Sequence, residues 1–158
     1  MKRHLDNTPS GEWAKGGAYV LVLNIKRSLR LSIGALGEFL LKRGTYLYIG
    51  NARKGIGGRV RRHIRLSHRK GGPEHWHIDT VLNNPFVELE DALAFPGTDE
   101  CTISKALARR AGVEAPVPGF GASDCRMGCS AHLYRLGPGF QGRISSLASI
   151  IADMLSAE

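Results

Sequence analysis

The sequence predicts a single α+β domain built on a small mixed or antiparallel sheet flanked by helices. The chain has 158 residues, a usual length for one domain. Short apolar runs of strand composition occur among segments with helical periodicity. They do not alternate strictly, which favours α+β over α/β. We expect a polar N-terminal arm over residues 1–15 and one domain, including a C-terminal helix, over residues 16–158.

Five segments have the composition of strands and are bounded by glycine or polar residues. The run GTYLYIG, residues 44–50, is apolar on both faces and predicts a central strand. Residues 29–33 alternate between apolar and polar side chains, and we expect Gly34 and Gly37 to end that strand. The other strands are expected at residues 18–25, 86–95 and 132–137.

Four segments are expected to be helices. The strongest is residues 59–70, because Ile56, Val60 and Ile64 recur every four positions and the intervening residues are mostly basic. The other helices are expected at residues 74–84, at residues 98–112 with Thr98 or Asp99 as N-cap and Gly112 as C-cap, and at residues 142–158.

The chain is strongly basic, with a formal net charge of +8 and a pI of about 9.8. Between Phe39 and Pro73 there are ten Lys or Arg residues and no Asp or Glu. Such a segment attracts phosphates, and we expect nucleic acid, DNA in preference to RNA, as the partner. A solvated basic surface without a partner is the alternative.

The composition also bears on where the protein works. The longest apolar run, AYVLVL, is too short to cross a membrane. The start, MKRHLDNTPSGEW, lacks the apolar stretch of a signal peptide. Three cysteines, an odd number, indicate a reducing compartment. We expect a cytoplasmic protein without a membrane partner, associated with the nucleoid if it acts on DNA.

Side chains suited to phosphate chemistry surround the loop that joins the 44–50 strand to the basic helix. Tyr46 and Tyr48 point to the same face of the strand. Gly50 lets the chain turn or lets another group approach the backbone. Arg59 and His63 are four residues apart and share a helix face. A phenol, a guanidinium that can neutralise phosphate charge and an imidazole that can move a proton are therefore expected to converge here.

These residues resemble the signatures of the GIY-YIG nuclease superfamily. Within it, the chain resembles a branch catalogued as a domain of unknown function, members of which are found beside endonuclease III in some archaea. The resemblance extends from about residue 16 to about residue 136. The matching pieces are Gly17-Ala18-Tyr19, Tyr48-Ile49-Gly50, Arg59, His63, and the segments HWHID, DEC, GFGASDC and SAHLY.

The resemblance implies a metal-dependent endonuclease that leaves a 5′-phosphate. Tyr19 would activate the attacking water or act as general base, and Tyr48 would hydrogen-bond water or phosphate. Arg59 would offset charge on the scissile phosphate, with His63 as a second polar group one turn later. Glu100 would hold a hard divalent cation, Mg²⁺ or Mn²⁺, mostly with water ligands.

The first signature reads Gly-Ala-Tyr instead of Gly-Ile-Tyr. Because the loop before Arg59 is rich in glycine, Arg61 or Arg62 could take the role that the resemblance gives to Arg59. The main alternative is a non-catalytic nucleic-acid-binding module on the same scaffold, which would not need Tyr19, Arg59 and Glu100 in one cleft. A partner protein is expected to supply specificity. The residues expected to contact nucleic acid are Arg53, Lys54, Arg61, Arg62, Arg65 and Lys70.

The cysteines raise a separate question. Together with His132, Cys101, Cys125 and Cys129 are the residue types of a tetrahedral zinc site. The Cys-x3-Cys-x2-His spacing is tight, and Cys101 must reach the site from the side of its helix away from Glu100. Reduced thiols are therefore the favoured interpretation, and a zinc-stapled interaction domain is a third hypothesis.

The HWHID segment, residues 75–79, places two histidines, a tryptophan and an aspartate close together. We expect Trp76 to pack, and His77 or Asp79 to hydrogen-bond the neighbouring loops. A metal site formed by these histidines and the aspartate is the alternative.

Overall fold

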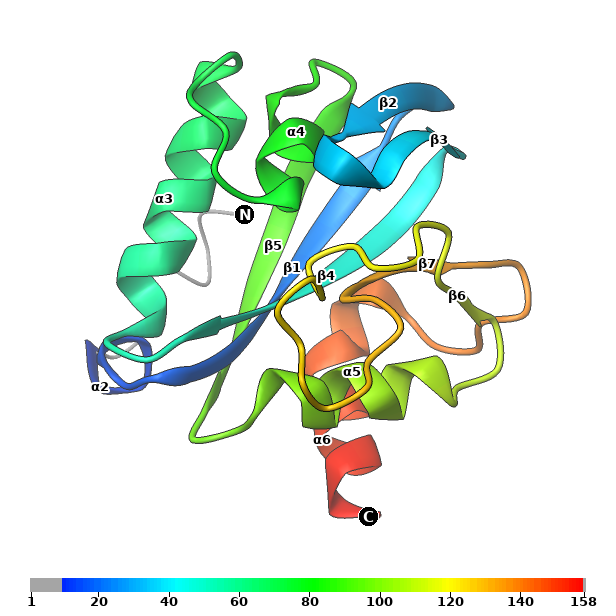
Figure 1. The fold of residues 1–158 in the computed structure, drawn as a ribbon. Helices are drawn as coiled ribbons and strands as arrows, with labels where there is room; N and C mark the ends of the chain where they lie inside the picture. The colour runs from blue at the N-terminus through cyan, green and yellow to red at the C-terminus, as the bar shows by residue number, and fades with distance from the viewer. Residues whose placement is uncertain (1–9, 158) are drawn as a thin grey trace.

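The two strands that carry the tyrosine motifs pair along their whole length. In the computed structural model, which describes residues 10–157, β1 (Gly17–Ile25) lies antiparallel to β4 (Gly44–Ala52) (Figure 1). β5 (Val87–Pro96) pairs with the other edge of β1, and β7 (Leu133–Leu136) and β6 (Val113–Glu114) continue from β4. The sheet has the order β5-β1-β4-β7-β6 with antiparallel neighbours throughout. The predicted α+β class is confirmed.

A second, two-stranded sheet lies beside the main one. β2 (Leu29–Ile33) pairs with β3 (Gly37–Leu41), and a short 3₁₀ turn over Gly34–Leu36 connects them. The predicted strand at 29–33 is confirmed. The strand ends directly before Gly34, as expected. Gly34 and Gly37 adopt positive φ angles of 46° and 101° and turn the chain into a hairpin, so that β3 begins at Gly37.

Helices cover both faces of the main sheet (Figure 1). α3 (Ile56–Arg69) and α4 (His77–Asn83) pack on one face, and α5 (Glu100–Ala108) and α6 (Leu147–Ser156) pack on the other. A 3₁₀ turn at Ile144–Ser146 precedes α6. All four predicted helices are present. α5 begins as expected with Asp99 as N-cap, whose carboxylate accepts from the Cys101 backbone N–H, but it ends at Ala108 and not at Gly112.

The alternation of side chains along β1 and β4 divides the core in two. Tyr19, Leu21 and Leu23 face α3 and α4, while Val20 and Val22 face α5 and α6. The central residues of both strands are buried on both faces, which explains why GTYLYIG contains so few polar residues. The two central strands are therefore fixed by packing on both faces, and they hold the side chains at their ends in defined positions.

The predicted N-terminal arm is partly structured. Residues 1–9 lie outside the described part of the chain. Ser10–Ala14 forms a short helix, α2, and Trp13 is buried in the core cluster that also contains Ile56 and Val60 of α3. The polar arm was therefore predicted too long, because a single tryptophan anchors its last turn.

Candidate functional site

Four of the five predicted catalytic residues line one open cleft of about 690 Å³. Tyr19 comes from β1, Tyr48 from β4, Arg59 from the start of α3 and Glu100 from the first turn of α5. β1 and β4 are neighbouring strands of the sheet, and α3 and α5 pack on its opposite faces, so only the folded chain brings the residues together. The fifth residue, His63, lies buried behind Tyr19.

Tyr19 and His63 form a buried pair. The Tyr19 hydroxyl lies 2.7 Å from His63 Nε2. Burial, with the nearby Arg62 and Arg59 cations, lowers the pKa of His63 to about 4, although Asp79 acts the other way. His63 is therefore neutral near pH 7. A neutral imidazole has one nitrogen without a proton, so His63 Nε2 can accept a hydrogen bond from the Tyr19 hydroxyl.

The phenol of Tyr19 is not ionised at rest. Burial raises its pKa well above the ordinary value, and Tyr48 and Glu100 raise it further, while Arg59 lowers it. The pKa of Tyr48 is also raised, by burial and by Glu100 and Asp79. Base chemistry by Tyr19 therefore needs a group that takes its proton, and His63 is in contact with it.

The glycine of the YIG signature makes room for Tyr19. Gly50 is the residue directly opposite Tyr19 in the β1–β4 ladder. A Cβ atom at Gly50 would clash with the Tyr19 ring and hydroxyl. The group that Gly50 allows to approach its backbone is therefore Tyr19, and the two signatures are one structural unit.

Tyr46 does not take part in the cleft. Although it shares a strand face with Tyr48, its hydroxyl donates to the Lys42 carbonyl over 2.6 Å, and its ring lies in the core. The face that the sequence predicts is correct, but only Tyr48 is close enough to the end of β4 to reach the cleft.

Arg59 lies against an aromatic platform. Its guanidinium lies 4.5 Å from the ring centre of Trp76, which is 41% exposed at the edge of the cleft. Arg62 approaches the same ring, at 4.4 Å. Trp76 therefore holds two cations, and only Arg59 of the two lines the cleft.

Asp79 explains how the HWHID segment is organised. Its buried carboxylate makes two 2.9 Å hydrogen bonds with Arg62 and accepts from the backbone N–H groups of His75 and Trp76. His77 Nδ1 accepts from the Gly121 N–H. The predicted hydrogen-bonding role of this segment is confirmed. Within residues 10–157, no group of metal-ligating residues includes it.

Four of the six residues expected to bind nucleic acid are exposed. The other two, Arg62 and Lys70, make bonds within the protein instead. Arg53, Lys54, Arg61 and Arg65 are exposed, and Arg53 and Lys54 also line a hollow of about 520 Å³ at the start of α3. Arg62 is committed to Asp79.

The prediction for Lys70 is wrong. Its Nζ atom donates to the carbonyls of Leu82, Asn84 and Val87 over 2.8–2.9 Å. Because all three donors of the ammonium are used within the protein, Lys70 joins the end of α3 to α4 and β5 instead of contacting a phosphate.

Glu100 lines the cleft from the first turn of α5. Its side chain is 29% exposed, and burial and Asp99 raise its pKa while Arg59 lowers it. One carboxylate oxygen lies 3.7 Å from His132 Nδ1. Asn51 and Asp124 line the same cleft and were not predicted as site residues. Asn51 directly follows Gly50, so its place could have been inferred, whereas that of Asp124 depends on the path of a long loop.

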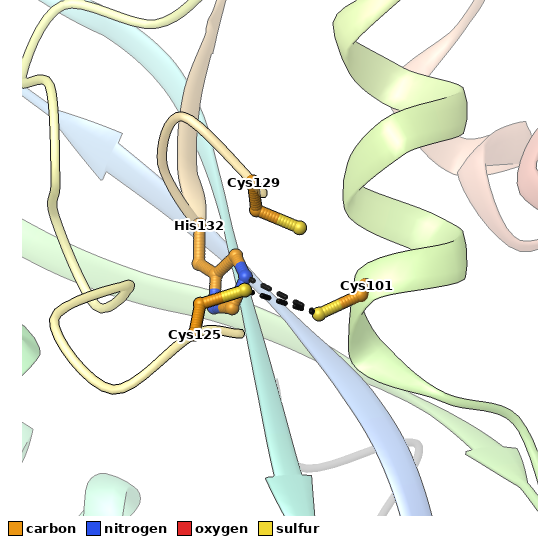
Figure 2. Close-up of side chains that lie close together, drawn as sticks. All are labelled: Cys101, Cys125, Cys129 and His132. Carbon is orange, nitrogen blue, oxygen red and sulfur yellow. Dashed lines mark hydrogen bonds between the residues drawn. The ribbon is translucent and has the colours of Figure 1, made fainter. Parts of the chain in front are cut away.

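The cysteines and His132 form a compact cluster (Figure 2), and His132 also contacts Glu100. The sulfurs of Cys101, Cys125 and Cys129 and a ring nitrogen of His132 all lie within 4.8 Å of one another. All three cysteines are free thiols. Reduced thiols are what the sequence predicts, and the arrangement could also hold a metal ion. The Cys-x3-Cys-x2-His spacing is possible because Cys125, Cys129 and His132 lie in an irregular loop that passes close to Cys101 in the first turn of α5.

No curated protein and no solved structure matches the chain. In the described part of the chain, no helix combines the length and apolar character needed to span a membrane. One family model, described as a domain of unknown function (DUF123), matches residues 18–152, and the chain therefore belongs to this family.

Proposed function

We propose that the protein is a metal-dependent endonuclease that hydrolyses DNA phosphodiester bonds at a GIY-YIG-type site. One observation carries this proposal, namely that Tyr19, Tyr48, Arg59 and Glu100 line one cleft. A module that only binds nucleic acid needs the basic surface but has no use for a glutamate and a buried Tyr19–His63 pair at its centre. That binding module remains the second candidate.

The Tyr19–His63 pair supports a specific route for the proton of the attacking water. As the water oxygen attacks phosphorus, its proton passes to the Tyr19 oxygen while the Tyr19 proton passes to His63 Nε2. A free phenolate is then never required, which suits the raised pKa of Tyr19. Tyr48, which lines the same cleft, would hydrogen-bond the water or a phosphate oxygen.

Arg59 supplies positive charge where the phosphate would lie. Its stacking on Trp76 restricts the side chain, so the guanidinium is held in place before substrate arrives. Replacing Arg59 by alanine is expected to lower the cleavage rate about 100- to 1000-fold, as is typical for one lost electrostatic donor.

The cleft also suits a hard divalent cation. Glu100, Asn51 and Asp124 offer oxygen atoms there, and oxygen is the ligand that Mg²⁺ and Mn²⁺ prefer. When bound, such a cation would neutralise charge on the leaving 3′ oxygen. Glu100 is the residue that we assign to it, because it projects from the same cleft as Tyr19 and Arg59.

The cysteine–histidine cluster calls for a different metal. Three thiolates and an imidazole favour Zn²⁺ over Mg²⁺, which takes oxygen ligands. We therefore propose two metals of distinct character, a hard cation at Glu100 and zinc at the cluster.

DNA is expected to reach the cleft along the basic loop and helix. Arg53 and Lys54 lie between the cleft and the start of α3, and Arg61 and Arg65 are exposed along that helix. These residues would offer phosphate contacts without an obvious means of reading bases. We propose that specificity comes from DNA shape or from a partner protein, and that the protein works in the cytoplasm at the nucleoid.

The test is a cleavage assay on duplex, nicked, branched and single-stranded DNA, with matched RNA, in Mg²⁺, Mn²⁺ or EDTA. We expect metal-dependent nicking that leaves 5′-phosphates and that is lost in Glu100→Gln and reduced in Arg59→Ala. The matched control is Glu88→Gln. Glu88 is an exposed residue of β5 that pairs with Lys26. Binding without cleavage by the wild type would support the binding module instead.

A further inference from the structure

We propose that Cys101, Cys125, Cys129 and His132 form a structural zinc centre that positions Glu100 through the second ring nitrogen of His132 (Figure 2). The zinc centre itself stands independently of the proposed nuclease activity. The consequence for Glu100 rests on the proposed function, in which that carboxylate holds the catalytic cation.

The geometry is close to that of a loaded tetrahedral site. With Zn–S bonds of about 2.3 Å and Zn–N bonds of about 2.0–2.1 Å, ligand atoms lie roughly 3.5–3.8 Å apart. The Cys101 and Cys125 sulfurs are 3.5 Å apart, and the Cys101 sulfur lies 4.0 Å from His132 Nε2. A disulfide would require about 2.05 Å. Four protein ligands would fill every position of a tetrahedral site, which is typical of a structural zinc and not of a catalytic one.

The centre would stabilise a segment that lacks regular structure. Residues 115–132, which all belong to the described part of the chain, contain no helix or strand. Loops of this length without secondary structure are uncommon in compact domains and are usually functional. Gly121, Asp124 and Met127 of this loop line the cleft. A metal that joins the loop to Cys101 of α5 therefore fixes one wall of the cleft.

His132 connects the two sites. Nε2 faces the cysteine sulfurs, while Nδ1 lies 3.7 Å from a Glu100 carboxylate oxygen. A metal on Nε2 requires the ring proton on Nδ1, and the Glu100 oxygen 3.7 Å away would accept that N–H after a small approach. Carboxylates placed in this way orient a metal-bound histidine, and the histidine in turn fixes the carboxylate. Cys101 is the next residue after Glu100, so the first turn of α5 is held at both positions.

The zinc centre is tested by metal analysis of the purified protein. We expect about one zinc ion per chain, released when the thiols are titrated, and a tetrahedral cobalt spectrum after exchange. Zinc should be lost in Cys125→Ser and retained in His132→Cys, which keeps four ligands. Wild-type protein from zinc-supplemented cells that holds no zinc, and binds neither added zinc nor cobalt at this site, would overturn the proposal even if the cysteine variants do not fold.

The connection to Glu100 is tested by zinc affinity, without any cleavage assay. Glu100→Gln is expected to bind zinc roughly 10- to 100-fold more weakly in competition with a chelator, since removing such an outer partner has effects of that size. Glu88→Gln, the matched control, should match the wild type. Equal zinc affinity in Glu100→Gln and the wild type would contradict the connection.

The reciprocal measurement is Mn²⁺ titration of His132→Cys. We expect Mn²⁺ binding at the cleft to weaken by about 10- to 100-fold while the zinc stays bound. Unchanged Mn²⁺ binding would contradict the positioning of Glu100. A wild type that binds zinc, shows both affinity changes and cleaves nothing would support this inference while contradicting the proposed nuclease function.

Discussion

At the scale of single residues, the Tyr19 hydroxyl is the group on which the proposed chemistry depends most. It lies between the cleft and the buried His63 imidazole, and Gly50 leaves it just enough room. Packing fixes the Tyr19 ring as much as its hydrogen bond does. The ring fills the space that a side chain at position 50 would occupy.

Tyr19→Phe should therefore separate catalysis from folding. The ring keeps its packing against Gly50 and only the oxygen is lost, so we expect DNA affinity and thermal stability close to the wild type. The cleavage rate should fall about 100- to 10,000-fold, the usual contribution of a positioned base. The matched control is Tyr46→Phe, which loses its hydrogen bond to the Lys42 carbonyl away from the cleft. It should lose about 1 kcal/mol of stability and keep its rate.

His63 makes stability depend on pH. Its pKa is about 4 in the folded protein and 6.5 ordinarily, so between these values the unfolded chain binds a proton that the folded chain does not. Its contribution to the free energy of unfolding is complete above pH 6.5 and is lost as the pH falls through 4. The loss is of the order of 3 kcal/mol in total.

Denaturant unfolding between pH 7 and pH 4 measures this contribution. The slope of stability against pH should be smaller in His63→Gln than in the wild type by up to about 1.4 kcal/mol per pH unit. The comparison with the variant removes the share of His132, whose pKa is also lowered by burial. Identical slopes would mean that His63 is not held neutral.

At the scale of elements, α3 divides its basic residues between two tasks. Lys70, at its end, donates three hydrogen bonds to carbonyls of the following segments, and Arg62 pairs with the buried Asp79. Arg61 and Arg65 remain exposed. A single basic helix is thus both a structural brace and the proposed DNA contact.

Two substitutions distinguish these tasks. Lys70→Met should lower the free energy of unfolding by about 1–3 kcal/mol, because it leaves part-buried carbonyls without donors, while DNA affinity stays nearly constant. Arg61→Met should weaken DNA binding and leave the unfolding midpoint unchanged. A loss of DNA affinity in Lys70→Met together with a loss of stability in Arg61→Met would contradict this division.

The elements that the sequence predicted best are those with the strongest burial. β1, β4, β5 and α3 carry regular apolar patterns because they face two core clusters. β3 was missed because its exposed position 40 is a leucine, so Phe39, Leu40 and Leu41 form one apolar run without alternation. β6 has only two residues and lies in a stretch rich in proline and glycine.

The part of the site that the sequence predicts lies on the elements with regular apolar patterns. Tyr19, Tyr48, Arg59 and Glu100 stand at fixed places in recognisable strands and helices, and they converge. The cysteine cluster and the brace formed by Lys70 depend on where long loops return, and local sequence does not record that path. Asp79 was expected to hydrogen-bond loops, but its pairing with Arg62 needed the fold to be seen.

At the scale of the whole molecule, the antiparallel sheet joins two layers that each contribute half of the site. The layer with α3 brings Arg59 and His63, and the layer with α5 brings Glu100 and Cys101 (Figure 1). The cleft lies where β1 and β4 meet these helices. Arg53 and Arg59 line the cleft together with Cys101, Cys125 and His132 of the cysteine–histidine cluster, so the proposed DNA substrate would enter from the basic side.

This charge distribution predicts a strong dependence of DNA binding on salt. The logarithm of the association constant should fall linearly with the logarithm of the salt concentration, with a slope that reports the number of phosphates contacted. Removing Arg61 or Arg65 should reduce the slope by about one each. Binding that is insensitive to salt would contradict the proposed DNA surface.

The most direct test of the central claim is single-turnover cleavage of DNA in Mg²⁺ by wild-type and Glu100→Gln protein, with binding measured on the same samples. We predict that both proteins bind DNA and that only the wild type cleaves it, leaving 5′-phosphates and losing activity in EDTA. Cleavage by Glu100→Gln at the wild-type rate, or DNA binding by the wild type with no cleavage of any substrate, would contradict the nuclease account.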